Sequence, residues 1–353
     1  MPGFRNEKTL EQQKTERKIL ILRIVFLAMI LAGLLLFVWA WEKRSNESKL
    51  NPEAGMELKA PAKQAAAVTY KGETYIPRDD LETTLLMGTD VSEDEPRSAR
   101  EGGYSMADVL VLIVANKTDK TYTVIQINRD TITPITMMSD DGKVEGYFNG
   151  QITLAYAYGG SPVRCAKNTI EAVRRTLLNI PIDHYVAVTM DSVGVLNDMV
   201  GGVTVEVMDD GIGPDLVKGQ KAKLNGEQAL RYVRARRSLD NPTNEHRMER
   251  QKQFLTGLMD SFRKKSARDS SFVMDVLVKL SEYMDSDCSI QQLSDLLNTF
   301  VAYEQAEFTG LKGESVSGET LKDFGDHTVF TEFYPDREGI WDLVMRVFYK
   351  KNK

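Results

Sequence analysis

Arg129 and Asp130 stand directly after a β-branched, alternating stretch of the chain, Tyr122–Ile127. Such alternation predicts a β-strand, and α/β proteins bind their ligands beyond the carboxyl ends of sheet strands. An arginine at such a place can hold a phosphate group through two parallel hydrogen bonds, and the neighbouring carboxylate can orient it. Such a pair can therefore act as a phosphate clamp. The alternative, which the local sequence alone favours, is a structural Arg–Asp pair in a turn.

A second group of polar side chains lies further along the chain. Arg234 and Arg236 are two residues apart, so they face the same side of an extended segment. Arg247 and Arg250 are three apart and share one face of a helix, with Gln251 beside them. Several arginines around one pocket are costly unless an anion fills it. The group therefore predicts a strongly anionic ligand, and the alternative is a solvated basic patch.

Two aspartates border predicted strands. Asp90 follows the apolar run Thr83–Met87 and a Gly-Thr turn, and Asp108 opens the continuous apolar run Val109–Ala115. Carboxylates at strand ends beside glycine-rich loops are natural ligands of a hard cation such as Mg²⁺. They can therefore be metal ligands, but spacing alone favours the alternative, two loop-edge aspartates that cap or form turns.

The histidines and cysteines indicate no second metal centre. His184, His246 and His327 are isolated in the sequence, so we expect no Cys/His cluster for zinc. Cys165 and Cys288 can pair in an oxidising compartment, yet a domain of this size has core enough without a disulfide. Their redox state stays open.

The overall charge excludes one class of function. The net charge is −6 and the isoelectric point is near 5.4. A general nucleic-acid-binding surface requires a basic domain. We therefore expect no nucleic-acid partner.

Strands and helices alternate along most of the chain. A turn cluster at 116–120 separates Val109–Ala115 from Tyr122–Ile127, which predicts a hairpin. A fully apolar strand such as Val109–Ala115 is buried on both faces, so helices must cover the sheet on both sides. Further strands are expected at 185–189 and 203–207, and helices at 162–178, 191–200, 224–234, 245–262, 275–283, 290–303 and 340–348. The pattern predicts one α/β domain.

The N-terminal region predicts a membrane anchor. Residues 19–41 are nearly all apolar, with Arg23 the only charge, and about 20 such residues cross roughly 30 Å of hydrocarbon. Basic residues in 1–18 place that tail in the cytoplasm, and the rest of the chain outside. The alternative is a cleaved signal peptide, whose apolar run is ordinarily shorter.

Four segments follow from these patterns. We expect a cytoplasmic tail at 1–18, a single transmembrane helix at 19–41, a polar linker at 42–80 and an extracellular domain at 81–353. Within that domain we expect a core at 81–262 and a helical C-terminal extension at 263–353.

Together, these stretches resemble the LytR–CpsA–Psr family of cell-envelope proteins. The matching pieces occur in family order: Leu85–Asp90, Asp108 before 109–114, Ile127–Thr131, Asn149–Gly160, Ile182–Val186, Leu196–Val207, Leu224–Arg236 and Arg247–Gln251. One motif alone would be weak, but the ordered set behind a membrane segment is specific. The resemblance covers about residues 80–260.

The resemblance implies a fold and an activity. The fold is a single extracellular α/β/α domain with a mixed central sheet and an apolar tunnel for a polyprenyl chain. Family members transfer glycopolymers, such as teichoic acid or capsule polysaccharide, from undecaprenyl-pyrophosphate carriers to peptidoglycan in Gram-positive-type envelopes. The bond formed is a phosphodiester, usually to an N-acetylmuramic acid hydroxyl, and Mg²⁺ or Mn²⁺ is the cofactor. The resemblance thus implies a phosphotransferase of the cell membrane.

Roles follow for the matching residues. By resemblance, Asp90 and Asp108 hold the metal, and the pyrophosphate is gripped by Arg129, Arg234, Arg236, Arg247, Arg250 and Gln251. The candidate catalytic residues are Arg129, Asp130, Arg234 and Arg236. Metal and arginines would neutralise the charge that develops on a transferring phosphoryl group.

The sequence departs from the family pattern at three places. Met106 stands where the family often has arginine, Val91-Ser92-Glu93 follow the first metal aspartate in place of an arginine, and Asn244 stands where aspartate is common. Arg97 and Arg100 are candidate substitutes for the arginines, and Asp240 for the carboxylate. These departures keep two further functions open, namely a non-catalytic polyprenyl-pyrophosphate-binding scaffold and a lipid pyrophosphate hydrolase.

Overall fold

The computed structural model describes residues 67–90, 105–139, 141–235, 239, 241, 243–318 and 330–352. These belong to one compact unit, Leu58–Lys353. The predicted anchor at 19–41 and most of the predicted linker lie outside the described residues, as do Arg236 and Asp240. Within the described part of the chain, no helix is long and apolar enough to cross a membrane.

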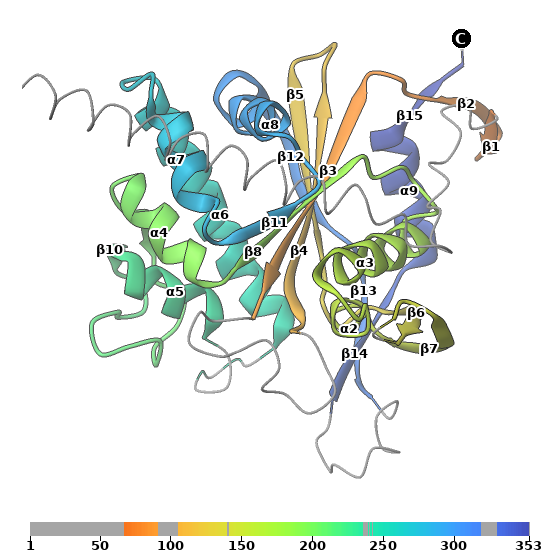
Figure 1. Cartoon of the computed structure of the whole chain (residues 1–353), viewed down its shortest axis with the longest axis horizontal. Helices are drawn as coiled ribbons and strands as arrows, with labels where there is room; N and C mark the ends of the chain where they lie inside the picture. Colours follow the sequence, from red (N-terminus) through yellow and green to blue (C-terminus); the bar gives the residue numbers. More distant parts are fainter. Residues whose placement is uncertain are drawn as a thin grey trace, which may run out of the picture. The chain divides into compact units, whose positions relative to one another are not determined.

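A six-stranded sheet, in the order β11-β8-β3-β4-β5-β12, forms the centre of the described domain (Figure 1). Its strands are β3 (Leu81–Thr89), β4 (Ala107–Asn116), β5 (Thr121–Ile127), β8 (His184–Thr189), β11 (Met284–Ser286) and β12 (Glu304–Gly310). The β3–β4, β4–β5 and β11–β8 pairs are antiparallel, and the β3–β8 and β12–β5 pairs are parallel. The expected mixed sheet is confirmed.

The β4–β5 hairpin forms where the sequence predicted it. The Asn116 side chain accepts hydrogen bonds from the backbone amides of Thr118 and Asp119, at 3.0 and 2.8 Å. Asparagine makes such side-chain turns readily, which stabilises the reversal of the chain. Lys120 closes the turn with a positive φ of 54°.

The apolar run of β4 supplies two hydrophobic cores. Leu110, Leu112 and Val114 belong to one core, whereas Val111 and Ile113 belong to the other. Successive side chains of a strand point to opposite faces, so both faces of β4 are buried. This explains why the strand is continuously apolar.

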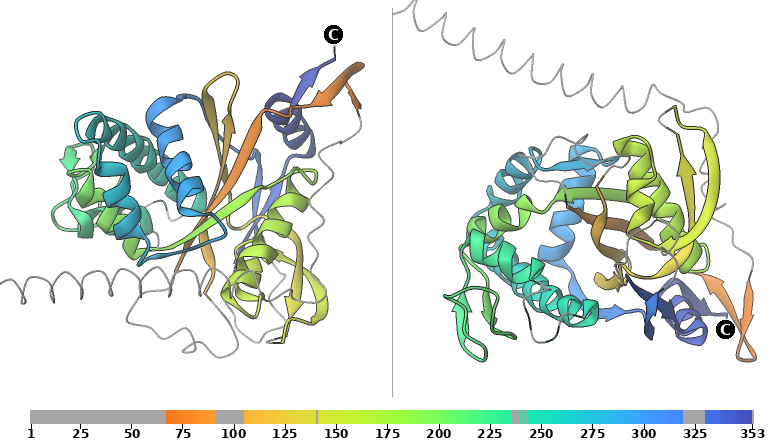
Figure 2. Two further views of the ribbon diagram at one scale, coloured as in Figure 1. Left: turned by 45° about the horizontal axis from the view of Figure 1, so that its top comes forward. Right: turned by 90° about the horizontal axis from the view of Figure 1, so that it is seen from below.

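The two faces carry different elements (Figures 1 and 2). One face is covered by α2 (Leu154–Ala157), α3 (Pro162–Thr176) and α9 (Arg337–Phe348), together with the hairpin of β6 (Ile132–Met138) and β7 (Val144–Gln151). The other is covered by α4 (Asp191–Met199), α5 (Gly226–Arg234), α6 (Asn244–Ser266), α7 (Phe272–Leu280) and α8 (Ile290–Ala302). Both faces of the sheet are therefore closed by helices, as predicted.

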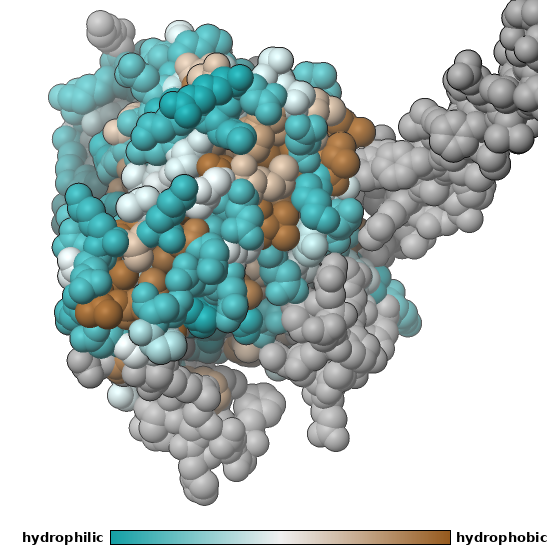
Figure 3. Space-filling model, turned by 90° about the vertical axis from the view of Figure 1, so that its left-hand side faces the viewer, coloured by the Kyte–Doolittle hydropathy of each residue, from teal (hydrophilic) through white to brown (hydrophobic). Residues whose placement is uncertain are grey.

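Small strand pairs complete the described domain. They are β9 (Thr204–Glu206) with β10 (Lys221–Lys223), β13 (Gly313–Gly318) with β14 (Phe330–Pro335), and β1 (Val68–Tyr70) and β2 (Glu73–Pro77) with β15 (Tyr349–Lys351). The outer side of the α4–α7 helices is mainly polar, with small scattered apolar groups (Figure 3). That distribution is ordinary for amphipathic helices packed on a core.

Two expected boundaries were wrong. Residues 68–77, predicted as the end of the linker, form the β1–β2 hairpin, and β2 pairs with β15 near the C-terminus. Residues 263–353 are not a helical extension outside the core, because β11 and β12 from this segment supply the two edge strands of the central sheet. Neither pairing has a local sequence signal, because each joins segments far apart in the chain.

The two cysteines are both free thiols in the described structure. Cys165 lies in the core under α3, whereas Cys288 packs in a small cluster with Val186, Leu277 and Leu293. The side chains belong to different cores, so the disulfide that the sequence left open does not form here.

Candidate active site

Three of the predicted site residues, Asp90, Asp108 and Arg129, lie close to one another where three strands begin or end. Gly88 pairs with Val109, and Leu110 pairs with Ile127. The end of β3, the start of β4 and the end of β5 therefore lie side by side. Asp90 follows β3, Asp108 is the second residue of β4, and Arg129 follows β5.

Asp108 lies between two guanidinium groups. Arg129 donates from Nη1 to Asp108 Oδ1 in a short ion pair. Arg247, which comes from α6, places its Nη1 at 3.7 Å from Asp108 Oδ2. The Asp108 and Arg129 side chains keep 19% and 15% of their surface exposed. These charges are therefore shielded from water only in part and are accessible to a ligand.

Asp130 orients the side chain of Arg129. Its carboxylate is 1% exposed, and Oδ1 accepts from Gln151 Nε2 at 2.9 Å and from Arg129 Nε at 3.4 Å. The backbone amide of Asp130 donates to the Asn128 side chain at 2.9 Å. Asp130 is thus placed to position Arg129 rather than to touch a substrate.

A chain of side-chain amides joins this turn to α6. Asn244 Nδ2 donates to Asn128 Oδ1 at 2.6 Å, and Arg247 Nη2 donates to Asn244 Oδ1 at 2.6 Å. Asn128, Asn244 and Arg247 are all buried. Sequence reasoning missed Asn128 altogether and treated Asn244 only as a departure from a family pattern, although its place at the start of a helix was a usable signal.

The start of α6 favours an anion. Thr243 caps the helix by accepting a hydrogen bond from the amide of His246 at 3.3 Å. Arg247 stands in the first turn, where the amides not used by the helix and the helix dipole favour negative charge. Two guanidinium groups, one of them from the first turn of α6, therefore converge on Asp108.

The chain is similar to known proteins. The family model described as the LytR_cpsA_psr family matches residues 45–333. The chain belongs to this family.

Its relatives include named transferases. The chain is 30% identical over 258 residues to the polyisoprenyl-teichoic acid--peptidoglycan teichoic acid transferase TagU of Enterococcus faecalis, covering 70% of this chain and 77% of that one. It is 29% identical over 257 residues to TagU of Halalkalibacterium halodurans, covering 68% and 78%. Among solved structures, B. subtilis TagV matches with a TM-score of 0.58 and 25% identity, over 76% of this chain and 96% of that one.

The two metal ligands that the LytR–CpsA–Psr resemblance implies come from neighbouring strands, because Asp90 directly follows β3 and Asp108 belongs to β4. Asp90 Oδ1 accepts from the backbone amide of Met106 at 2.9 Å, which fixes its carboxylate beside the start of β4. Asp90 and Asp108 offer oxygen donors only, which is the donor set that Mg²⁺ and Mn²⁺ prefer. The residues present fit such a cation.

Arg250 does not lie where the LytR–CpsA–Psr resemblance placed it. It is 1% exposed and donates to Asp209 Oδ2 at 2.5 Å, to the Tyr232 carbonyl at 3.3 Å and to the Ala235 carbonyl. These contacts occupy the guanidinium within the protein and hold the end of α5 against α6. Arg250 therefore supports the segment that leads to Arg236 and is not placed to grip an anion directly.

Asp209 is the charged partner of Arg250. Burial alone would raise the pKa of Asp209, but hydrogen bonds from Arg250 and His246 outweigh it and hold the pKa below its ordinary value. His246 Nε2 lies 2.8 Å from Asp209 Oδ1. This placement gives His246 a structural partner.

Gln251 and Arg234, which were also predicted to bind the pyrophosphate, lie in different surroundings. Gln251 is buried, accepts from Gln126 Nε2 at 3.2 Å and donates to the Val233 carbonyl at 3.3 Å, so it joins α6 to β5 and α5. Arg234 is the last residue of α5 and is exposed. Arg236 lies outside the described residues.

Proposed function

We propose that this protein is a membrane-anchored phosphotransferase that moves a cell-wall glycopolymer from an undecaprenyl-pyrophosphate carrier to peptidoglycan. One observation carries the proposal, namely the placing of Arg129 and Arg247 on either side of Asp108 at the end of the sheet. The two guanidinium groups can bind a phosphate group, and the partly exposed Asp108 carboxylate between them can bind a metal cation. The TagU relatives are named as teichoic acid transferases, which supports the proposal that this chain is a transferase of the same class.

The chemistry is a substitution at phosphorus. A hydroxyl of the acceptor attacks the phosphate attached to the glycan, the new P–O bond forms, and the bond to undecaprenyl phosphate breaks. The hydroxyl proton passes to solvent or to the leaving phosphate. The products are a glycan–phosphate–peptidoglycan diester and undecaprenyl phosphate.

The residues of this site act mainly by position and charge. Arg129 and Arg247 hold the phosphate groups and offset the charge that grows on the leaving oxygen, which is the main form of catalysis for phosphoryl transfer. Asp130 and Asn244 keep the two guanidinium groups in place. A Mg²⁺ or Mn²⁺ ion held by Asp90 and Asp108 would supply a Lewis acid for the phosphate oxygens.

Location follows from the predicted anchor. With the N-terminus in the cytoplasm, the domain lies outside the membrane beside its lipid-linked substrate and the wall. Confinement of enzyme and substrate to one surface raises their effective concentration without new contacts.

The test uses the full-length chain in detergent micelles. It is incubated with an undecaprenyl-pyrophosphate-linked glycan, Mg²⁺ and peptidoglycan fragments, and the products are identified by mass spectrometry. We expect the phosphodiester adduct, and we expect Arg129→Ala to lower its rate by about 10²–10³-fold. The matched control is Arg175→Ala, since Arg175 lies in the last turn of α3 and donates to the Pro134 carbonyl rather than to a residue of the candidate site.

The same experiment separates the other two functions. Lipid binding with neither adduct nor released phosphate would overturn transfer and favour the scaffold. Phosphorylated glycan released at one rate with or without peptidoglycan would favour the hydrolase, because water would then be the acceptor.

A further inference from the structure

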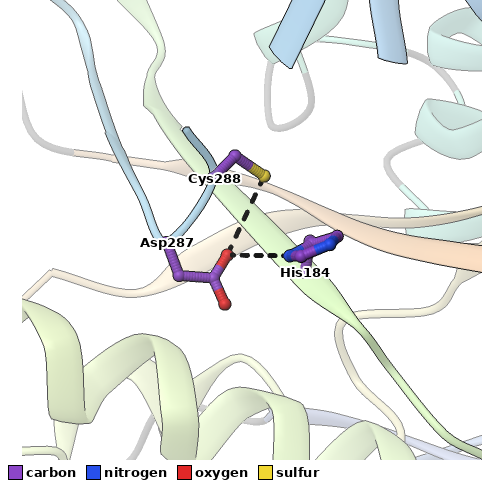
Figure 4. A group of neighbouring side chains, drawn as sticks. All are labelled: His184, Asp287 and Cys288. Atoms are coloured by element: carbon purple, nitrogen blue, oxygen red, sulfur yellow. Dashed lines mark hydrogen bonds and ion pairs between the residues drawn. The ribbon is translucent and has the colours of Figure 1, made fainter. Parts of the chain in front are cut away.

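Three metal-binding side chains meet at the opposite end of the sheet from Asp108. His184 is the first residue of β8, and Asp287 and Cys288 follow β11 (Figure 4). One ligand atom from each lies within 4.8 Å of the others. The isolated histidines of the sequence predicted no Cys/His cluster for zinc, but the structure brings His184 close to Cys288.

Strand pairing creates this cluster. β11 runs antiparallel to β8, with Ser286 opposite Val186, so the next two residues of the chain come beside His184. In the adjacent pair of strands, Thr84 lies opposite His184 and Thr89 opposite Thr189. Since Asp90 follows Thr89, the cluster and the candidate active site are separated by the length of β8.

The turn that carries Asp287 and Cys288 is held firmly. The amide of Tyr185 donates to Asp287 Oδ1 at 2.9 Å, and Ser286 Oγ donates to the Tyr185 carbonyl at 2.6 Å. The amide of Cys288 donates to Ser286 Oγ at 3.0 Å. The ligand atoms are therefore positioned before any ion binds.

The spacing suits a tetrahedral ion. His184 Nδ1 and Cys288 Sγ each lie 3.9 Å from Asp287 Oδ1. Ligands bound tetrahedrally at about 2.0–2.3 Å stand roughly 3.5 Å apart. A small contraction of the cluster therefore brings all three atoms into the range of coordination.

The surroundings of His184 also suit coordination through Nδ1. Glu82 Oε1 lies 3.9 Å from His184 Nε2, and Lys117 holds the other Glu82 oxygen at 2.8 Å. A carboxylate near the second ring nitrogen stabilises the N–H that a metal-bound imidazole presents there. Gln292 Nε2, at 3.1 Å from the same nitrogen, donates to it in the ion-free state and must turn aside.

We propose that His184, Asp287 and Cys288 bind one Zn²⁺-class cation, with water as the fourth ligand. The mixture of sulfur, nitrogen and oxygen donors selects a borderline-soft ion, whereas Mg²⁺ prefers oxygen alone. The ion would clamp the short edge strand β11 and the start of α8 to β8.

The experiment titrates the full-length, EDTA-treated chain in detergent with Co²⁺, in the presence of excess Mg²⁺ to occupy oxygen-only sites. Co²⁺ bound to a thiolate gives a charge-transfer absorbance that Zn²⁺ does not. We expect this absorbance to saturate at one Co²⁺ per chain and to disappear when one equivalent of Zn²⁺ is added. We also expect saturating Zn²⁺ to raise the Tm by about 5 °C, because it binds the folded state alone.

Two variants and a control make the result specific. Cys288→Ser should abolish the charge-transfer absorbance, and Asp287→Asn, which keeps an acceptor for the Tyr185 amide, should weaken Co²⁺ binding at least tenfold. Cys165→Ala, the matched control in the other core, should leave the absorbance unchanged. The proposal is overturned if no saturable absorbance arises, if it persists in Cys288→Ser, or if Cys165→Ala removes it. Because Mg²⁺ is present throughout, these outcomes are independent of whether the chain transfers glycopolymer.

Discussion

Asn244 donates a 2.6 Å hydrogen bond to the side-chain carbonyl of Asn128 and at the same time accepts one from Arg247. The side chain therefore uses a donor and an acceptor, which an ionised carboxylate cannot do. This gives a physical reason for an asparagine where the family resemblance led us to expect aspartate. It also joins the turn after β5 to the helix that carries Arg247.

Replacing Asn244 by Asp tests this relationship. The new carboxylate faces Asn128 Oδ1 with an oxygen, and Asn128 cannot simply turn, because its Oδ1 also accepts from the amide of Asp130. We expect the free energy of unfolding to fall by about 1–3 kcal/mol, the cost of an unmet buried hydrogen bond. Urea unfolding measures it.

Asn241→Asp is the matched control for that variant. Asn241 is exposed and its Oδ1 only accepts hydrogen bonds, from the amide and the hydroxyl of Thr243. A carboxylate serves those donors equally well, so stability should not change. Equal stability of Asn244→Asp and wild type would show that the amide network is not needed.

Arg250→Ala should act on stability rather than on substrate. The change leaves the buried Asp209 carboxylate without its guanidinium partner, and breaking a buried pair in this way costs about 3–5 kcal/mol. Thermal and urea unfolding measure the loss. A variant with wild-type stability and no lipid pyrophosphate binding would instead restore the prediction that Arg250 grips the anion.

The lowered pKa of Asp209 predicts that part of the folding stability is lost in acid. Its pKa is lower in the folded state than in the unfolded state, so it stabilises the fold at pH values above about 4, its unfolded pKa. That contribution is lost as pH falls through the lowered folded pKa. We expect Asp209→Asn to be less stable than wild type at pH 7 and the difference to shrink in acid, as measured by urea unfolding from pH 7 to pH 3. A difference that does not vary with pH would contradict this account.

Asp90→Asn should separate metal binding from folding. Asparagine keeps an oxygen to accept from the Met106 amide but lacks the charge that attracts the cation. We expect the Mg²⁺ concentration for half-maximal transfer to rise by about tenfold or more, with an unchanged Tm. The control is Asp141→Asn, since Asp141 pairs only locally with Ser139 and Lys143 on the exposed surface. An Mg²⁺ dependence identical to wild type would remove Asp90 from the metal site.

Removal of metal gives a complementary result. EDTA should stop transfer, and Mg²⁺ or Mn²⁺ alone should restore it, because the candidate active site offers oxygen ligands. Restoration by Zn²⁺ but not by Mg²⁺ would contradict the assignment of Asp90 and Asp108.

The sequence by itself determined the local elements and indicated several candidate site residues. The β4–β5 hairpin, α4 and α6 follow from apolar periodicity and turn residues, and each depends on neighbours in the chain. Asp108 and Arg129 were found because they flank readable strands. Such elements can be predicted because apolar periodicity and turn residues depend only on neighbours in the sequence, so no partner from elsewhere in the chain is needed.

Only the tertiary structure decided which arginines reach Asp108. Arg247 and Arg250 share one helix and look alike in sequence, yet one reaches Asp108 and the other is enclosed by Asp209 and two carbonyls. Likewise, His184 meets Cys288 only because β11 pairs with β8. Such contacts join residues distant in sequence, and the packing that selects them depends on the whole sheet and its two cores rather than on any local pattern.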